Sequence, residues 1–171
     1  MSSKKKRKYL IFVLVALFLV LATATMIYYF SSQNGEESTE TSRGFTLFVL
    51  RLFNPNYDDL TVEEQLDYCS NLQYIVRKLA HFSEFFLLGF FLELYLDMRR
   101  YKMAPIISLI LGVLYAFFDE WHQSFVEERG PGITDVLIDS SGVLSGILIM
   151  FVIRYFYKKF IVKCRNKLQS A

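Results

Sequence analysis

Four apolar runs divide this chain, and each is long enough to cross a lipid bilayer. A transmembrane helix rises ~1.5 Å per residue, so about 20 apolar residues cover a hydrocarbon core of ~30 Å. The predicted spans are residues 9–30, 77–97, 104–123 and 134–157. Because the bilayer offers no hydrogen-bond partners, each span must satisfy its own backbone, as an α-helix does. The sequence therefore predicts an all-α fold, an integral membrane four-helix bundle.

The composition also indicates a protein whose solvent is lipid. Hydrophobic residues make up 53% of the chain and aromatic residues 17%, which is a high share for a soluble domain. A cleaved signal peptide is the alternative interpretation of the first run, because the start is basic and Ala22-Thr23-Ala24 resembles a cleavage site. Apolar and aromatic residues continue to Phe30, and this length favours an uncleaved anchor.

Basic residues gather beside the spans and predict which way the chain crosses the membrane. The tail 1–8, the loop between the second and third spans and the tail 158–171 together hold 13 of the 19 lysines and arginines. Cytoplasmic loops carry an excess of these residues, so we expect a multi-pass protein of the cell membrane with both termini cytoplasmic. Basic clusters also occur on nucleic-acid-binding surfaces, but each one here adjoins a span. No nucleic acid is therefore expected as a partner.

The long connection 31–74 is then predicted to be extracytoplasmic. Its first part, up to Gly44, is polar and typical of a surface loop. The apolar stretch 45–53 is too short to span and predicts a short interfacial helix. Thr61 and Glu64 have the spacing of a capping box, which predicts a helix over 62–74 that can continue into the second span.

Ionisable residues near the outer ends of three spans are the most unusual feature of the sequence, because hydrocarbon rejects charge. Counting ~1.5 Å per residue places them in one layer, in the outer leaflet. Helical spacing puts Arg77, His81 and Glu84 on one stripe and Asp135 and Asp139 on another, so we expect the stripes to face a common pocket. The candidate catalytic residues are His81, Glu84, Asp119 and His122. The candidate ligand-binding residues are Arg77, Lys78, Glu120, Gln123, Arg129, Asp135 and Asp139.

The energetics of burial constrain how these groups pair. Each ionised group at a span centre costs ~2.5 to 3.5 kcal/mol to insert. Arg77 and Lys78 at the rim are therefore expected to pair with deeper carboxylates, unless those acids are neutral. The opposite halves of the spans are almost wholly apolar, and Glu93 is an exception that we expect to find a polar partner or to extend toward the membrane surface.

The fourth span has a face of small residues, which predicts close packing against another helix. Gly142 and Gly146 are four residues apart and share the face of Asp135 and Asp139. Such a face lets a second helix approach closely in a membrane. The surface that packs is thus predicted to carry the carboxylates as well.

Three segments resemble the VanZ-like family, which is named for a teicoplanin-resistance membrane protein of Gram-positive bacteria. They are Arg77–Phe85, Asp119–Val126, and Arg129 followed by Asp135–Gly142. The exit from the first span, Phe30–Gln33, is also similar to the family. The resemblance covers about residues 28–153 and indicates a VanZ-like core over 75–157. Relatives often have Pro-Gly where this chain has Glu127-Glu128, which makes its outer loop more acidic.

The resemblance implies an integral protein of the bacterial cytoplasmic membrane and cell envelope. One member of the family is linked to low-level resistance to the antibiotic teicoplanin. It supplies no reaction, so it leaves open whether the chain is an enzyme and whether it needs a cofactor. Membrane lipids are the expected partners, with a lipid-linked wall precursor or an anionic envelope polymer as the candidate ligand.

Four function classes remain open from the residues, and a small transporter or channel is the least favoured because the inner halves of the spans are almost wholly apolar. A pocket that binds or modifies an envelope lipid or wall precursor is favoured, because Arg77, Lys78 and Arg129 suit an anion. A metal-dependent membrane hydrolase or transferase is an alternative, since the histidines and acids of the layer are metal-ligand types, although no zinc signature is present. A structural or interaction protein, whose polar cluster only fixes helix packing, is the other alternative. Polar contacts between membrane helices average only ~0.6 kcal/mol, so this set is large for stability alone.

Overall fold

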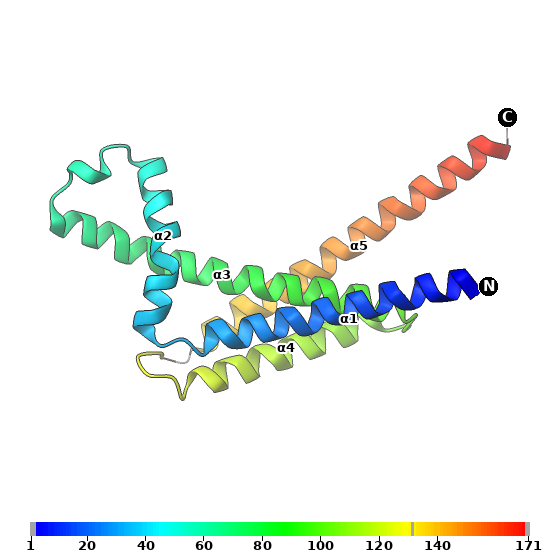
Figure 1. Cartoon of the computed structure of the whole chain (residues 1–171), viewed down its shortest axis with the longest axis horizontal. Coiled ribbons are helices and arrows are strands. Elements are labelled where there is room, and N and C mark those ends of the chain that lie inside the picture. The colour runs from blue at the N-terminus through cyan, green and yellow to red at the C-terminus, as the bar shows by residue number, and fades with distance from the viewer. Residues whose placement is uncertain (1–2, 131, 170–171) are drawn as a thin grey trace.

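The computed structural model describes residues 3–130 and 132–169, with side chains described up to residue 160. The elements in order are α1 (Ser3–Ser31), α2 (Gly35–Phe53), η1 (Tyr57–Asp59), α3 (Val62–Met98), α4 (Ala104–Gln123) and α5 (Ile133–Gln169) (Figure 1). No strand occurs in these described ranges, so the predicted all-α fold is confirmed. The ends of the predicted tails, residues 1–2 and 170–171, lie outside the described residues.

Four helices are long and apolar enough to cross a membrane: α1, α3, α4 and the part of α5 up to Phe160. Each contains one of the four predicted spans. Helix α3 is much longer than its span, because the helix that begins at the Thr61 cap continues without a break into it. The capping box is present, and the Glu64 carboxylate accepts from the Thr61 backbone N–H at 3.0 Å.

Helix α2 corrects one prediction. Residues 31–44 were expected to form a loop, but α2 begins at Gly35 and includes the apolar stretch 45–53 as its second half. Asn34 caps the helix: its side chain accepts from the Glu37 N–H at 2.8 Å, and the Glu37 carboxylate accepts from the Asn34 N–H at 3.1 Å. This capping box has asparagine in the place of the usual serine or threonine. The serines and threonines of this stretch indicated a loop by composition, whereas the cap and the contact with α3 favour a helix.

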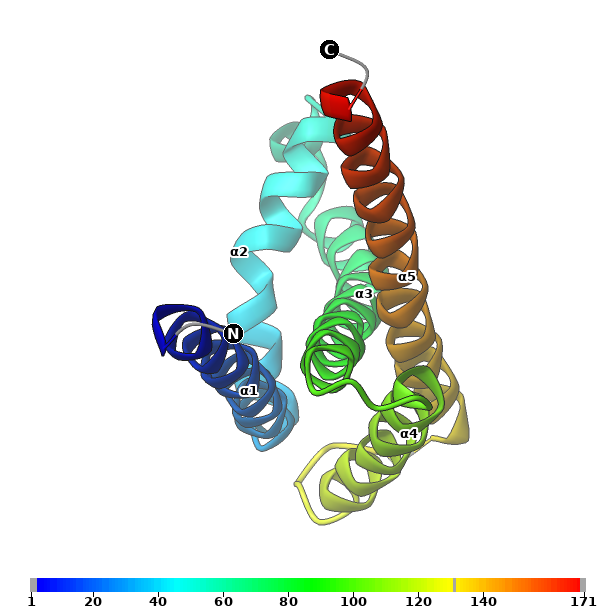
Figure 2. The same cartoon turned by 90° about the vertical axis from the view of Figure 1, so that its right-hand side faces the viewer.

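The bundle is arranged around α3, which lies between α1 and α5 when viewed along the helices (Figure 2). The N-terminus, the C-terminus and the α3–α4 connection lie toward one end of the bundle (Figure 1). Helix α2, η1 and the α4–α5 connection lie at the opposite end, which we call the α2 end. The three basic segments of the sequence therefore share one end, and the polar residues of the candidate pocket lie toward the other.

Close packing of α5 against α3 holds the bundle together at the level of the predicted glycine face. A Cβ atom built on Gly146 would lie 2.7 Å from the backbone nitrogen of Phe90, and one built on Gly142 would lie 3.1 Å from that of Phe86. The first distance is shorter than real Cβ atoms show and the second is tighter than most real contacts, so these glycines confirm the predicted close approach. The surrounding buried core contains Ile27, Phe85, Leu88, Leu92, Ala116, Val136, Val143 and Ile147.

Candidate functional site

The polar residues of three spanning helices converge toward the α2 end of the bundle, below the α4–α5 connection. Ten of the eleven candidate residues either line one of three neighbouring cavities there or belong to a buried cluster beneath them. The exception is His122. Periodicity along each helix predicted these faces, and the close α3–α5 contact brings them together.

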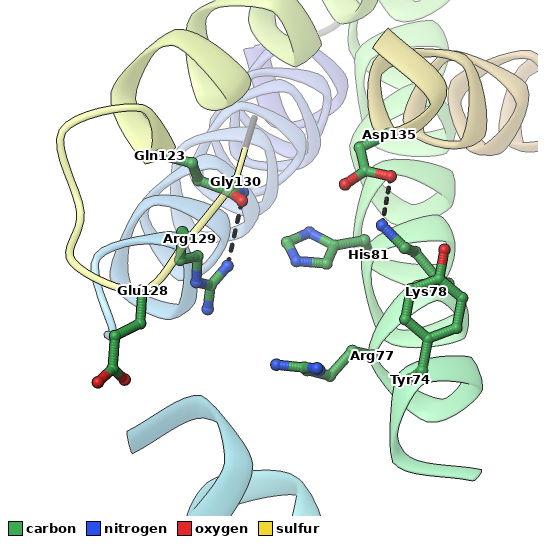
Figure 3. A pocket seen from close by; sticks show the side chains of 9 residues that line it. All are labelled: Tyr74, Arg77, Lys78, His81, Gln123, Glu128, Arg129, Gly130 and Asp135. Carbon is green, nitrogen blue, oxygen red and sulfur yellow. Dashed lines mark hydrogen bonds and ion pairs between the residues drawn. The ribbon is translucent and has the colours of Figure 1, made fainter. Parts of the chain in front are cut away.

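The first cavity, of about 250 Å³, opens between α3 and the α4–α5 connection (Figure 3). It is lined by Tyr74, Arg77, Lys78, His81, Gln123, Glu128, Arg129, Gly130 and Asp135. Lys78 forms an ion pair with Asp135, as predicted for the cations at the rim. Arg77 departs from that prediction, because it forms no ion pair with any residue in the described ranges. Its guanidinium instead extends into the cavity (Figure 3).

Arg129 closes the opposite wall of this cavity. Its guanidinium donates to the Gln123 side-chain oxygen and to the Phe30 carbonyl oxygen, both at 3.2 Å. The second bond ties the α4–α5 connection to the end of α1, where helix carbonyls lack partners and favour a cation. Burial and the nearby charge of Arg77 lower the pKa of Arg129. The two guanidinium groups are thus held near each other across the cavity.

A second cavity, of about 240 Å³, lies between α2 and α3 and shares Arg77, His81 and Arg129 with the first. Much of its remaining wall is apolar or weakly polar: Phe30, Gln33, Ser38, Thr41, Ser42, Phe45, Val76 and Ala80. Helix α2 is held there by Gln73, which donates to the Thr39 carbonyl oxygen at 2.6 Å and to the Ser42 hydroxyl at 3.1 Å. The sequence analysis did not predict that α2 lines this cavity. The spacing of Asn34 and Glu37, which form the capping box of α2, was the signal that could have indicated the helix.

Below the cavities lies a layer of buried acids. Asp119 and Asp139 are each 2% exposed, and Glu120 is also buried. The Gln123 amide donates to an Asp119 carboxylate oxygen at 2.8 Å and to the Ser31 hydroxyl at 2.7 Å, which fixes α4 against α1. Glu120 accepts from the Gly132 backbone N–H. His81 lies 4.0 Å from the Glu84 carboxylate, beyond hydrogen-bonding distance.

A family model described as VanZ/LLP1 matches residues 12–154. The chain belongs to the VanZ/LLP1 family. The matched residues include most of the four candidate spanning helices and the whole polar layer. No curated protein and no solved structure matches the chain. Family membership together with the four apolar helices indicates a VanZ-like multi-pass membrane protein.

His122 of this VanZ/LLP1 protein lies apart from the cavities, although it belongs to the same layer. Its ring lies against that of Tyr28 on α1, with the ring centroids 4.7 Å apart. It lines none of the three neighbouring cavities described above. The helix period of α4 predicts on which face His122 lies. It does not predict that α1 packs against that face.

The VanZ/LLP1 protein also has a second polar cluster, toward the end of the bundle that holds the termini. Glu93 is 1% exposed and accepts from the Ser108 hydroxyl at 3.1 Å and from Arg154 at 3.3 Å. Arg154 also pairs with Asp97. The prediction that this half of the spans is almost wholly apolar is therefore wrong, whereas the expected polar partner of Glu93 exists. Arg154 was missed, although it is a lone cation within the last apolar run.

The arrangement combines two kinds of chemistry at short range. At the rim, Arg77 and Arg129 offer hydrogen-bond donors in the forked geometry that matches phosphate or carboxylate. Beneath them, an imidazole and several buried carboxylates offer lone pairs to a proton or a cation. His81 belongs to both groups, because it lines the cavities and adjoins the buried acids.

Proposed function

We propose that this VanZ/LLP1 protein binds an anionic lipid of the bacterial cell envelope, with a lipid-linked wall precursor as the ligand class. The headgroup lies in the first cavity, and the start of its hydrocarbon chain lies in the second. The observation that carries this proposal is that the two cavities share Arg77, His81 and Arg129. A charged pocket that adjoins an apolar one suits an amphipathic ligand.

Electrostatics support an anion at the rim. Arg77 and Arg129 face the same cavity with like charges, and the burial of Arg129 strengthens their repulsion. A phosphate between them would remove this repulsion and accept forked hydrogen bonds from both groups. Hydrogen bonds to charged groups contribute about 1.5 to 3 kcal/mol each. A zwitterionic headgroup also carries a phosphate, but the two guanidinium groups would repel its cationic part, so an anionic headgroup is favoured.

The neighbouring cavity supports a ligand with a hydrocarbon part. Phe45 on α2 is 60% exposed and lines this cavity together with Val76 and Ala80 on α3. A hydrocarbon chain placed against these side chains gains about 25 cal/mol for each Å² of apolar surface removed from water. A free inorganic anion would leave this wall uncovered, so a lipid-linked anion is the better fit.

We further propose that the α2 end lies in the outer leaflet, with both termini in the cytoplasm, because the basic segments lie at the other end. Cys69 on α3 then faces the outside. In intact cells a membrane-impermeant thiol reagent should label the wild-type protein but not Cys69→Ser, and a reporter fused after Lys167 should be cytoplasmic. Labelling only after the cells are opened, or an extracellular reporter, would contradict this sidedness.

The binding proposal predicts a selective loss in the arginine variants. Full-length protein in detergent is titrated with a polyprenyl diphosphate, and with phosphatidylcholine as a zwitterionic control, using native mass spectrometry. Arg77→Ala and Arg129→Ala should each weaken diphosphate binding by about 10- to 100-fold, which corresponds to one lost charge-assisted contact. Arg43→Ala is the matched control, because Arg43 is exposed on α2 and lines neither cavity. An equal loss in the control would mean that binding is nonspecific.

Teicoplanin susceptibility distinguishes a working site from a scaffold. We propose that a Gram-positive host carrying the wild-type protein becomes less susceptible to teicoplanin, and that Arg77→Ala removes this effect at unchanged membrane abundance and melting temperature. If every loss of resistance instead follows a loss of folded protein, the polar cluster only fixes helix packing. The Lys78–Asp135 and Gln123–Ser31 contacts between helices are the features that would then explain its presence.

A further inference from the structure

Three side chains from three different helices converge in the buried layer. His81 of α3, Asp119 of α4 and Asp139 of α5 each offer one possible ligand atom, and these atoms all lie within 4.8 Å of one another. Ligands held ~2.0 to 2.2 Å from one metal ion in tetrahedral geometry are about 3.4 Å apart. The geometry is therefore close to that of a site with three protein ligands.

Unsatisfied lone pairs in this cluster provide a second and independent observation. One carboxylate oxygen of Asp139 is buried and has no hydrogen-bond partner among the described residues, and the same is true of the Nδ1 atom of His81. Asp139 is 2% exposed, so an ionised carboxylate there is costly unless something binds it. Asp119 is already engaged, because its carboxylate accepts from the Gln123 amide and interacts with the Ser31 hydroxyl, so it would bind an ion through its remaining lone pairs.

The nearby cations do not neutralise these acids. Lys78 pairs with Asp135, and Arg129 donates to Gln123 and to the Phe30 carbonyl. In the described part of the chain, no lysine or arginine forms an ion pair with Asp119 or Asp139. A cavity of about 10 Å³ beside His81 and Asp139 has room for roughly one water-sized sphere. The layer thus has buried carboxyl groups that lack an ion-pair partner among the described residues, and space for a small ion.

We propose that His81, Asp119 and Asp139 bind one divalent transition-metal ion, Zn²⁺ or Mn²⁺. The imidazole favours Zn²⁺ over Ca²⁺ and Mg²⁺, and the two carboxylates also suit Mn²⁺ and balance the double charge. Three protein ligands leave a coordination position open toward the cavity that His81 lines, as in sites where a metal ion contacts a water or a ligand. The ion also links α3, α4 and α5. The site does not depend on the proposed lipid, because all of its ligands belong to the chain.

The test is metal binding in the absence of lipid ligands. Full-length protein in detergent is stripped with a chelator, titrated separately with Zn²⁺ and Mn²⁺ by calorimetry, and assayed for bound metal by mass spectrometry of the elements. The wild-type protein should bind about one ion per chain and melt at a higher temperature when loaded. Asp119→Asn and Asp139→Asn should weaken binding by at least about 10- to 100-fold, the loss seen when only a supporting contact of a metal site is removed.

Controls separate this site from adventitious binding. Asparagine is nearly isosteric with aspartate, so the two variants should fold, and their melting temperatures without metal check this. Asp67→Asn, on the part of α3 beyond the cavities, should bind metal as the wild type does. His81→Ala should lose binding and His122→Ala should not, because His122 lies against Tyr28.

Two results would overturn the metal site. One is a wild-type protein that holds well under one ion per chain with both metals, in which case a proton shared between the carboxyl groups accounts for the layer. The other is an equal loss in His81→Ala and His122→Ala. Failure of the lipid proposal is distinguishable, because it would leave metal binding intact and change only the titrations with polyprenyl diphosphate.

Discussion

Gly146→Ala is expected to destabilise the bundle by about 1 to 3 kcal/mol or more, the usual range for overpacking a tight interface. A Cβ atom at this position would lie against the Phe86 carbonyl oxygen and 2.7 Å from the Phe90 nitrogen of α3. Both are backbone atoms, so no side-chain rotation can make room. Helices α3 and α5 must separate, and the polar layer between them must open with them.

The matched control is a glycine-to-alanine substitution at a helix position with no neighbouring atoms. A Cβ atom at Gly44 on α2 would meet no atom within 4 Å. Alanine there should raise stability by up to about 0.5 to 1 kcal/mol, because glycine is a poor helix former. Thermal unfolding of both variants in the same detergent measures the difference. Opposite shifts support close α3–α5 packing, whereas two small shifts of the same sign would contradict it.

Arg154→Met should lower stability by about 3 to 5 kcal/mol, the loss typical of breaking a buried ion pair on one side. The substitution leaves the Glu93 carboxylate, which is 1% exposed, with the Ser108 hydroxyl as its one hydrogen-bond partner among the described residues. It also releases Asp97, which is partly exposed and can be solvated more easily. The expected result is a large fall in the melting temperature of the full-length protein in detergent.

Two further variants test whether the loss of stability comes from the unpaired Glu93 carboxylate. Arg51→Met breaks an ion pair with Asp58 whose side chains are 58% and 62% exposed, so it should cost only about 0 to 1 kcal/mol. Glu93→Leu combined with Arg154→Met removes both charges and should recover much of the loss, because replacing a whole buried pair is often neutral. If the double variant were less stable than Arg154→Met, burial of Glu93 would not be the reason.

Features that depend on short stretches of sequence were predictable. Span length, the Thr61 cap and the polar stripe of Arg77, His81 and Glu84 follow from helix rise and helix period. The resemblance of the same segments to the VanZ-like family agrees with the VanZ/LLP1 match. The first half of helix α2 was missed for a local reason, because its asparagine cap is a weaker signal than its serine- and threonine-rich composition.

What the sequence by itself determined is the all-α membrane fold, the four spans and the polar stripes near one end of three of them, since each depends on residues within one helix. Only the tertiary structure decided which side chains meet. Arg154 donates to Glu93, which lies 61 positions earlier in the chain, and the ring of His122 lies against that of Tyr28. Arg77 has no ion pair with any of the described residues. The physical reason is that such contacts depend on the rotation and relative height of whole helices. Those are set by packing such as that of Gly146 against α3, and no periodicity along a single helix encodes them.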